Sequence, residues 1–536
     1  MSVDVSEPRG GRGYTTLPNP RHVSYTVHQS EYKNDCIYAL MVMQFGQFMD
    51  HDITKTPVVD DSCCWKFNDM GECFSMKIDS SDPTFGNLTD CMDFHRSEVC
   101  VDGGINEIRY HYNQITAFVD ASNVYGSDWT TAQELRDTAD PSLLKFTTLD
   151  SGEEFLPKNT LAGVTGQFMA GDARCNEQPG LTAMHAIFLR EHNRIARLIK
   201  SQNLGLSSDQ IYEEARRIVG AELQKIFFGE YLPIVLGSKY SDYKLDTSKD
   251  SIYNPFTDPS IATAFATAAY RFGHTLIQND YELFDSFDHA SIGSLAIRDR
   301  FFDSSPNPAA QSSMLEIIYS LMRQHQQQSD RHFEAVVNEH VLLHTHVQGN
   351  WKSFGGDLVS FNIQRGRDHG LRGYNDWRCY CGLKPLTSMA TDARPEELSE
   401  ENWQKLGKIY KSVDQIDLYS AGISEINVED GLVGPTFACI IGHQAQRLRF
   451  GDRFFFTHLK PEKCKGAFCG FAGQGMNEEE KKVIRGRTLR GIICDNTILE
   501  IAPERIFEKH HLSRNPAKKC DYTELDEANI GVFLNF

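Results

Sequence analysis

A histidine flanked by polar side chains marks the segment QFGQFMDHDI, residues 44–53. Gln47, Asp50 and His51 fall at positions i, i+3 and i+4, so on a helix their side chains point the same way. Burying a histidine beside an amide and a carboxylate is costly unless each group has a partner or a purpose. A functional site is one interpretation, and the polar last turn of a helix is the other.

A second polar pair lies in GDARCNEQPG, residues 171–180, where Arg174 and Glu177 are three positions apart. This segment comes just before a long stretch with helical periodicity. Acidic side chains near a helix N-terminus are favourable by themselves, so capping explains the pair without any chemistry. Catalysis is the alternative.

Two later segments could bind a metal-containing group. In AYRFGHTLIQ, residues 269–278, His274 follows Gly273, and a glycine lets something bulky and flat approach the backbone. His274 is either an iron ligand or an ordinary core histidine. In FNIQRGRDHGL, the Asn362 carbonyl could accept a hydrogen bond from the second N–H of a ligating imidazole, and Arg365 could pair with a buried carboxylate. An ion-pair network at the end of an element also explains the second segment.

The run TAFVDASNVYG, residues 116–126, places oxygen-bearing residues at every second position. Hard oxygen ligands suit Ca²⁺, and Asp52, next to His51, could complete the set. Ordinary strands also alternate such residues. The proposed calcium ligands are Thr116, Phe118, Asp120, Ser122 and Asp52.

These motifs lie on or beside segments with helical periodicity, which predicts a mainly α fold: a single large helical domain with few short strands. We expect residues 1–34 to form an extended N-terminal arm, residues 35–530 the domain and residues 531–536 a tail. We expect residues 57–105 to form a loop region that disulfide bonds stabilise. The helices are expected at residues 37–53, 131–137, 181–202, 208–228, 261–277 and 312–346, and strands at residues 453–457 and 497–501.

The composition limits the classes of partner that this protein is expected to bind. A formal net charge of -19 argues against nucleic acid and anionic membrane surfaces, and the absence of an apolar run of 18 residues argues against a membrane span. Fourteen cysteines and an N-x-T acceptor at Asn87 indicate a secreted glycoprotein. The polar N-terminus lacks a signal peptide, so we expect the export signal upstream. No Cys-x-x-Cys spacing supports zinc, and disulfides are preferred.

Together, in this order and spacing, the five motifs resemble those of the animal haem peroxidases over nearly the whole chain. The resemblance implies haem b as cofactor, with His274 as the ligand of the haem iron and Asn362 as its hydrogen-bond partner. It implies that His51 is the catalytic base, that Arg174 stabilises negative charge on the leaving oxygen, and that Gln47 positions water or halide. Arg365 would hold a haem propionate, Asp50 and Glu177 would form ester links to the haem, and the five oxygen ligands would bind Ca²⁺.

The resemblance also implies the disulfides Cys63–Cys73, Cys64–Cys91, Cys381–Cys439 and Cys494–Cys520. Proximity suggests Cys464–Cys469, while Cys36, Cys100, Cys175 and Cys379 stay unassigned. Gln178 departs from the pattern, since some family members have a methionine there that forms a sulfonium link to haem. We therefore expect no third link and a weaker oxidation of chloride.

The expected function is the reduction of hydrogen peroxide with electrons from phenols, including protein tyrosines, or from halides and pseudohalides. A role in cross-linking extracellular matrix is a hypothesis. The alternatives are a structural matrix protein with little activity, and a relative of the cyclooxygenase or dioxygenase type, against which Asp50 and Glu177 both argue. The oligomeric state stays open.

Overall fold

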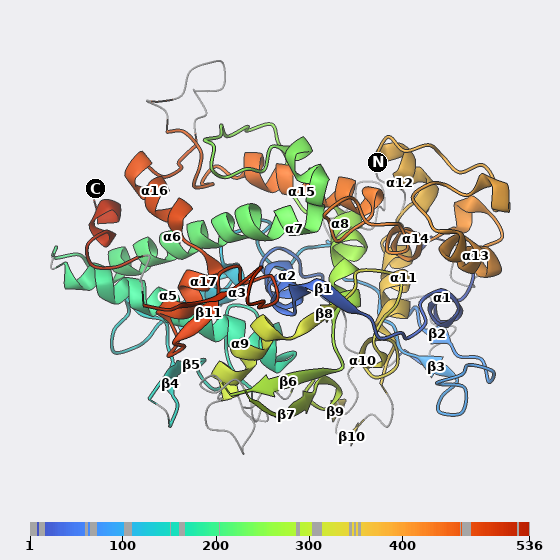
Figure 1. The fold of residues 1–536 in the computed structure, drawn as a ribbon, viewed down its shortest axis with the longest axis horizontal. Coiled ribbons are helices and arrows are strands. Elements are labelled where there is room, and N and C mark those ends of the chain that lie inside the picture. Colours follow the sequence, from blue (N-terminus) through green and yellow to red (C-terminus); the bar gives the residue numbers. More distant parts are fainter. Residues whose placement is uncertain are drawn as a thin grey trace.

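Two long helices run side by side through the computed structural model (Figure 1). They are α5, Pro179–Ser201, and α6, Ser208–Ile226. The Gln178 side chain caps the first by accepting from the Gly180 N–H. The structure describes residues 8–9, 17–58, 63–64, 72–100, 110–150, 152–159, 167–202, 204–285, 290–302, 313–341, 346–347, 350–351, 355–460, 463, 473–521 and 525–534.

Helix α2, Met41–Ile53, lies at the centre and is buried on nearly every side (Figure 1). It packs against α5, against α3, Ser122–Tyr125, and against the 3₁₀ helix η4, Ala269–Leu276. The sequence predicted this helix from residue 37. It starts later because strand β1, Asn34–Ala39, pairs with β8, His325–Gln327.

The sequence analysis expected the N-terminal segment to form an extended arm, but part of this segment is helical. Helix α1, Pro20–Val27, begins with Asn19 accepting from the Arg21 N–H and with Pro20 in its first turn, where a proline is tolerated. It packs against α11, Leu358–Asp368, and α13, Glu400–Ile409. Because this region is rich in Gly, Pro and Arg, the sequence analysis did not predict the short capped helix.

Two other expected helices are interrupted. Residues 261–277 form α8, Thr263–Thr267, and then η4, with the break at Ala268, whose backbone is non-helical (φ -136°, ψ -71°). Residues 312–346 contain α9, Ser313–Arg323, and then strand β8, because residues 325–327 pair with β1. Helical periodicity cannot reveal a break that distant strand pairing imposes.

Apart from α15, which has 17 residues, the other described helices have at most nine residues. They are α4 Trp129–Glu134, α7 Leu232–Leu236, α10 Ala335–Asn338, α12 Tyr374–Tyr380, α14 Leu418–Gly422, α15 Pro435–Gly451, α16 Glu478–Gly486 and α17 Leu489–Asp495. A π-helical turn, η2 Phe227–Tyr231, continues α6, and further 3₁₀ turns are η1 Ala173–Asn176, η3 Gly237–Tyr243, η5 Ile297–Asp299, η6 Thr391–Ala393, η7 Val413–Gln415 and η10 Ile530–Leu534.

Strands are few and short, as expected, and the described ones form two-stranded antiparallel pairs. Residues 453–457 are turns rather than the expected strand, and of residues 497–501 only Ile501 belongs to one. The remaining strands are β2 Met76–Lys77, β3 Cys91–Met92, β4 Thr147–Thr148, β5 Glu154–Phe155, β6 Asp280–Phe284, β7 Ser291–Ala296, β9 His346–Val347, β10 Asn350–Trp351, β11 Ile501–Pro503 and β12 Ala517–Lys519.

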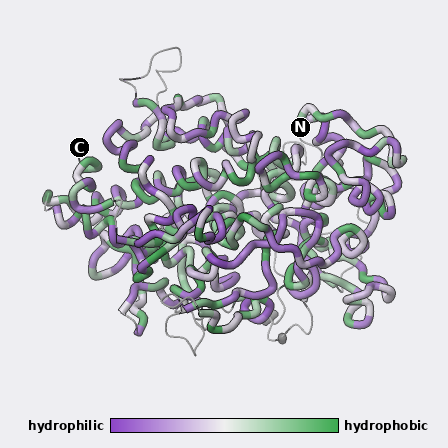
Figure 2. The backbone as a smooth tube through the Cα atoms, viewed as in Figure 1, coloured by the Kyte–Doolittle hydropathy of each residue, from purple (hydrophilic) through white to green (hydrophobic). Residues whose placement is uncertain are grey.

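One large hydrophobic core takes residues from Val23 to Leu534, so segments from both ends of the chain share it. Hydrophobic and hydrophilic residues alternate at short intervals along the helices in Figure 2, as expected where each helix turns one face to this core. Arg487, between α16 and α17, is fully buried. Its guanidinium pairs with Glu191 of α5, Glu222 of α6 and Asp495 of α17, and so ties α17 to the two long helices. No described helix has the length and apolarity that a bilayer crossing requires.

The structure contains the four disulfides that the resemblance implied: Cys63–Cys73, Cys64–Cys91, Cys381–Cys439 and Cys494–Cys520. Cys36, Cys100 and Cys379 are exposed thiols and Cys175 is a buried one. Cys464 and Cys469 lie outside the described residues. Asn87, the proposed glycosylation site, is exposed in a turn.

Candidate active site

One face of α2 lines a cavity of about 370 Å³. The lining residues on this helix fall at helical spacing, and they are Met43, Gly46, Gln47, Asp50 and His51. Gly46 must be small, because a Cβ there would come within 2.3 Å of the Tyr231 hydroxyl. The cavity therefore gathers the three polar residues that the sequence placed on one side of this helix.

Helix η4 supplies another wall, which includes Arg271, Gly273 and His274. A Cβ at Gly273 would meet no protein atom within 4 Å, so packing of the chain itself does not require a glycine here. The open space beside Gly273, with an imidazole next to it, suits a flat, iron-containing group such as haem. The residues present thus fit the cofactor that the resemblance implied.

His51 is buried, and its Nε2 lies 3.8 Å from Glu177 Oε2. Burial, assisted by the positive charge of Arg174, holds the pKa of His51 well below its ordinary value. The ring is therefore neutral at pH 7 and can accept a proton, which the role of a general base requires.

Arg174 is held in place by Asp172, a residue that the sequence analysis did not single out. Arg174 Nε donates to Asp172 Oδ1 at 2.9 Å, its Nη2 donates to Oδ2 at 2.8 Å, and Nη2 also donates to the Thr54 carbonyl at 2.9 Å. The adjacent guanidinium keeps the pKa of the buried Asp172 low against the effect of its burial. A bidentate pair of this kind fixes the position and the charge of Arg174.

Asp50 and Glu177 are the two carboxyl groups in the cavity wall. Burial raises the pKa of Glu177 to about 7, and it also raises the pKa of Asp50. The Thr54 hydroxyl donates to Asp50 Oδ1 at 2.8 Å. Glu177 is thus partly protonated near neutral pH, and the raised pKa of Asp50 favours its uncharged form in the same direction.

Gln47 belongs to a network of amides whose orientation is set by the backbone. The Gly180 N–H donates to Gln178 Oε1 at 2.7 Å, and the Tyr281 hydroxyl donates to the same oxygen. Gln178 Nε2 must therefore be a donor, and it donates to Gln47 Oε1 at 2.8 Å and to Gln44 Oε1 at 2.7 Å. As a result, the oxygen of Gln47 faces the network, and its NH₂ group is left to donate elsewhere, including to Glu177.

Asn362 contacts His274 as expected, but its amide is turned the other way. The nitrogen Nδ2 lies 2.8 Å from His274 Nδ1, whereas the sequence analysis assigned this contact to the carbonyl oxygen. The oxygen accepts from Arg271 Nη1 at 2.7 Å instead. The sequence analysis missed Arg271, although its place three residues before His274 put it on the same short helix.

Arg365 is absent from the residues that line the cavity. Its Nη1 donates to the His95 carbonyl at 2.8 Å, to Ser97 Oγ at 2.9 Å and to Asp368 Oδ2 at 3.0 Å. Its expected role at a propionate stays a prediction, and Arg271 is the better-placed guanidinium.

The proposed calcium ligands lie together behind His51. Asp120 N–H donates to Asp52 Oδ2 at 3.2 Å, Ser122 Oγ donates to Asp52 Oδ1 at 3.2 Å, and Thr116 Oγ1 donates to Asp120 Oδ1 at 2.9 Å. Phe118 belongs to the same loop. Burial and the neighbouring Asp120 carboxylate hold the pKa of Asp52 well above its ordinary value. Two buried carboxylates side by side are the donor set that a divalent cation neutralises.

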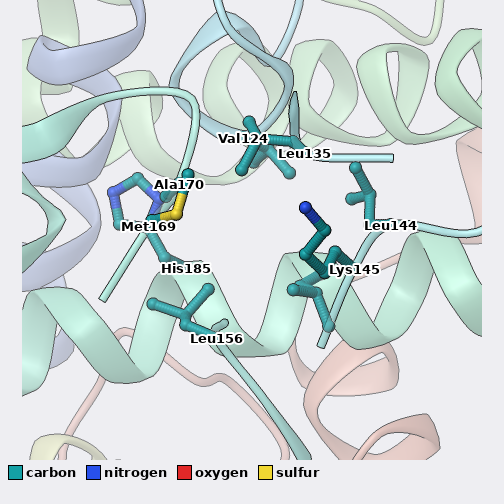
Figure 3. A pocket seen from close by; sticks show the side chains of 9 residues that line it. Val124, Leu135, Leu144, Lys145, Leu156, Met169, Ala170 and His185 are labelled. Carbon is teal, nitrogen blue, oxygen red and sulfur yellow. The ribbon is translucent and has the colours of Figure 1, made fainter. Parts of the chain in front are cut away.

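A small void of about 10 Å³ lies beside α5, lined by nine residues that include His185 (Figure 3). Neither ring nitrogen of the buried His185 has a hydrogen-bond partner, and the surrounding Val124, Leu135 and Leu144 are apolar. Burial lowers the pKa of His185 to about 4, so the ring is neutral in the folded protein. The void has room for about one water molecule.

We predict that His185→Leu stabilises the protein. The substitution removes two buried ring nitrogens without partners, which is expected to raise the free energy of unfolding at pH 7 by about 1 kcal/mol. Since a lowered folded-state pKa gives stability that is lost as the pH falls from 6.5 towards 4, the gain should grow by a further ~1–3 kcal/mol at pH 4. Urea unfolding at both pH values measures this. The exposed His22→Leu serves as control, and parallel pH profiles for wild type and His185→Leu would refute the prediction.

We predict that Gln178→Met destabilises the protein by about 1–3 kcal/mol, because it removes the acceptor of the Gly180 N–H and leaves the Gln44 oxygen and the Tyr281 hydroxyl only their 3.3 Å hydrogen bond to each other. Tyr281→Phe should cost less, since the Gly180 N–H still holds the Gln178 oxygen. Urea unfolding measures both, with the exposed Gln404→Met as the control. If Gln178→Met and Gln404→Met lowered the free energy of unfolding equally, the amide network would not contribute to stability.

The model of the animal haem peroxidase family matches residues 2–507 of the chain. The chain is 35% identical to the Peroxidasin homolog pxn-1 of Caenorhabditis elegans, over 95% of this chain and 41% of that protein. It is 35% identical to Homo sapiens myeloperoxidase, over 89% of this chain and 64% of that protein. The chain thus spans less than half of the nematode relative's length.

Solved structures have the same fold. Peroxidase A from Dictyostelium discoideum superposes with a TM-score of 0.75 at 23% identity, covering 95% of both chains. An Oryza sativa fatty acid alpha-dioxygenase superposes with a TM-score of 0.67 at 20% identity, covering 82% of this chain and 73% of that chain. At these identities the likeness concerns the fold alone. On the family match and the relatives above 30% identity, the chain belongs to the animal haem peroxidase family.

Proposed function

We propose that this chain is a secreted haem peroxidase that reduces hydrogen peroxide with electrons from phenols, including protein tyrosines, or from halides and pseudohalides. The observation that carries the proposal is that His51, Arg174 and Gln47 line the same cavity as His274. His51 is neutral at pH 7 and Arg174 is fixed by Asp172, as their roles require. Cross-linking of matrix tyrosines is the extracellular role we favour.

The proposed chemistry divides between the cofactor and the chain. Haem, bound through His274, supplies the redox chemistry. His51, neutral at pH 7, takes a proton from the peroxide and returns it to the departing oxygen. Arg174, held by Asp172, stabilises negative charge on that oxygen, and the NH₂ group of Gln47 orients a water molecule or an anion.

We propose further that Asp50 and Glu177 form ester links to haem methyl groups. Each link would replace one C–H bond of a methyl group by a C–O bond, with hydrogen peroxide as the two-electron oxidant reduced to water. Both line the cavity, and burial raises the pKa of each carboxyl group, which favours the uncharged form that an ester resembles. Gln178 has no sulfur and its amide is fully engaged by neighbours, so a third link is not expected.

The haem links are tested by the visible spectrum of protein secreted from haem-supplemented cells, recorded before and after acid–organic extraction. The wild type should keep its Soret band after extraction, and Asp50→Asn/Glu177→Gln should bind haem but lose the band on extraction. Turnover of tyrosine to dityrosine with peroxide is measured on the same samples, with His51→Leu as the inactive control. Wild type without a Soret band would contradict haem binding, and a loaded wild type that forms no dityrosine and oxidises no halide would contradict the activity.

We propose that Asp52, Thr116, Phe118, Asp120 and Ser122 bind Ca²⁺. Because the ion would bind only the folded chain, Ca²⁺ at about 100 times its Kd should stabilise the protein by about 2.7 kcal/mol, and a chelator should remove this gain. Thermal unfolding with Ca²⁺ or chelator checks the prediction. Asp120→Asn should lose most of the stabilisation by Ca²⁺, whereas the exposed Asp392→Asn should keep it. If a chelator does not change the thermal unfolding of the wild type, no such ion is bound.

A further inference from the structure

A second pocket, of about 220 Å³, lies on the opposite side of strand β6 from the cavity. Successive residues of a strand point to opposite faces, and Tyr281 lines the cavity while Glu282 and Phe284 line this pocket. Arg323, at the end of α9, and Lys509 complete its charged wall. None of the residues assigned to peroxide chemistry lines it.

The two cations of this pocket have neutral partners. Arg323 Nη1 donates to the Tyr319 hydroxyl at 2.9 Å, and Lys509 Nζ donates to His325 Nε2. Within the described part of the chain, neither cation forms an ion pair with a carboxylate. Both are partly buried, although most of the molecule's charge is negative. Cations in such a setting usually pair with an acidic group.

The electrostatics of the pocket favour an added negative charge. Burial lowers the pKa of Lys509, and the positive charge of Arg323 lowers it further, while Glu282 acts in the opposite direction. One carboxylate thus faces two cations. Burial also keeps the pKa of His325 low, so that this ring accepts the hydrogen bond of Lys509 instead of adding charge.

The pocket also has aromatic walls. The Arg323 guanidinium lies over the Phe284 ring, 5.4 Å from its centroid, and Tyr32 lines the pocket while 63% of its surface is exposed. We propose that this pocket binds a small aromatic anion, whose sulfate, phosphate or carboxylate oxygens contact Lys509 and Arg323. The ring of the ligand packs against Phe284 and Tyr32. The volume suits a small molecule.

Three probes that share one ring and differ in the charged group test the proposal: benzoate, phenyl phosphate and phenyl sulfate. Each is titrated by calorimetry into the full chain with its haem bound. At least one should bind with 1:1 stoichiometry, and Arg323→Gln and Lys509→Met should each weaken it by about tenfold, the effect of losing one charge-assisted hydrogen bond. The exposed Lys482→Met should bind as wild type does.

A second measurement locates the probe in unaltered protein. Acetylation of lysines, followed by mass spectrometry, should show Lys509 protected by the bound probe and Lys482 labelled as before. This readout does not depend on whether a variant folds. Absence of saturable binding for all three probes overturns the proposal. So does binding that leaves Lys509 unprotected, because the anion then occupies another site such as the peroxidase cavity.

Discussion

The pairing of polar groups on α2 is the constraint on which the rest of the structure depends. A buried polar group without a partner costs about 1–3 kcal/mol, and this nearly fully buried helix carries four in six residues, Gln47, Asp50, His51 and Asp52. Gln47 accepts from the Gln178 amide, and Asp52 accepts from the loop around Asp120. Asp50 accepts from Thr54, one turn away, while His51 lies near Arg174 and its Nδ1 has no hydrogen-bond partner among the described residues. The segments after α2 must therefore return to it. The cavity lies where they leave part of one face of the helix uncovered.

The sequence predicted the residues of the site better than it predicted the elements that hold them. Helices α5 and α6 were predicted to within two residues at each end, because their apolar periodicity is long and uninterrupted. The break at Ala268 and the end of α9 depend on packing and on strand pairing with β1, which no local pattern records. The cavity nevertheless gathers Gln47, Asp50, His51, Arg174, Glu177 and His274. Their spacing left a structural explanation open for each motif, and the family resemblance selected them together without reference to the path of the chain between them.

The residues missed at the site share one property: they act through another residue. Asp172 acts by accepting two hydrogen bonds from the Arg174 side chain. Arg271 acts by donating a hydrogen bond to Asn362. In the sequence, the first is an ordinary helix cap and the second an ordinary arginine. Contacts between segments distinguish them, and a single sequence does not contain those contacts.

The two amides that adjoin the reactive groups differ in how firmly they are oriented. The oxygen of Gln178 is fixed by a backbone N–H, which can only donate and cannot move away from its helix N-terminus. The oxygen of Asn362 is held by the guanidinium of Arg271, a side chain on the cavity wall that can turn to another acceptor. The orientation of the Gln178 amide is therefore set by the backbone, whereas that of the Asn362 amide is set by a side chain.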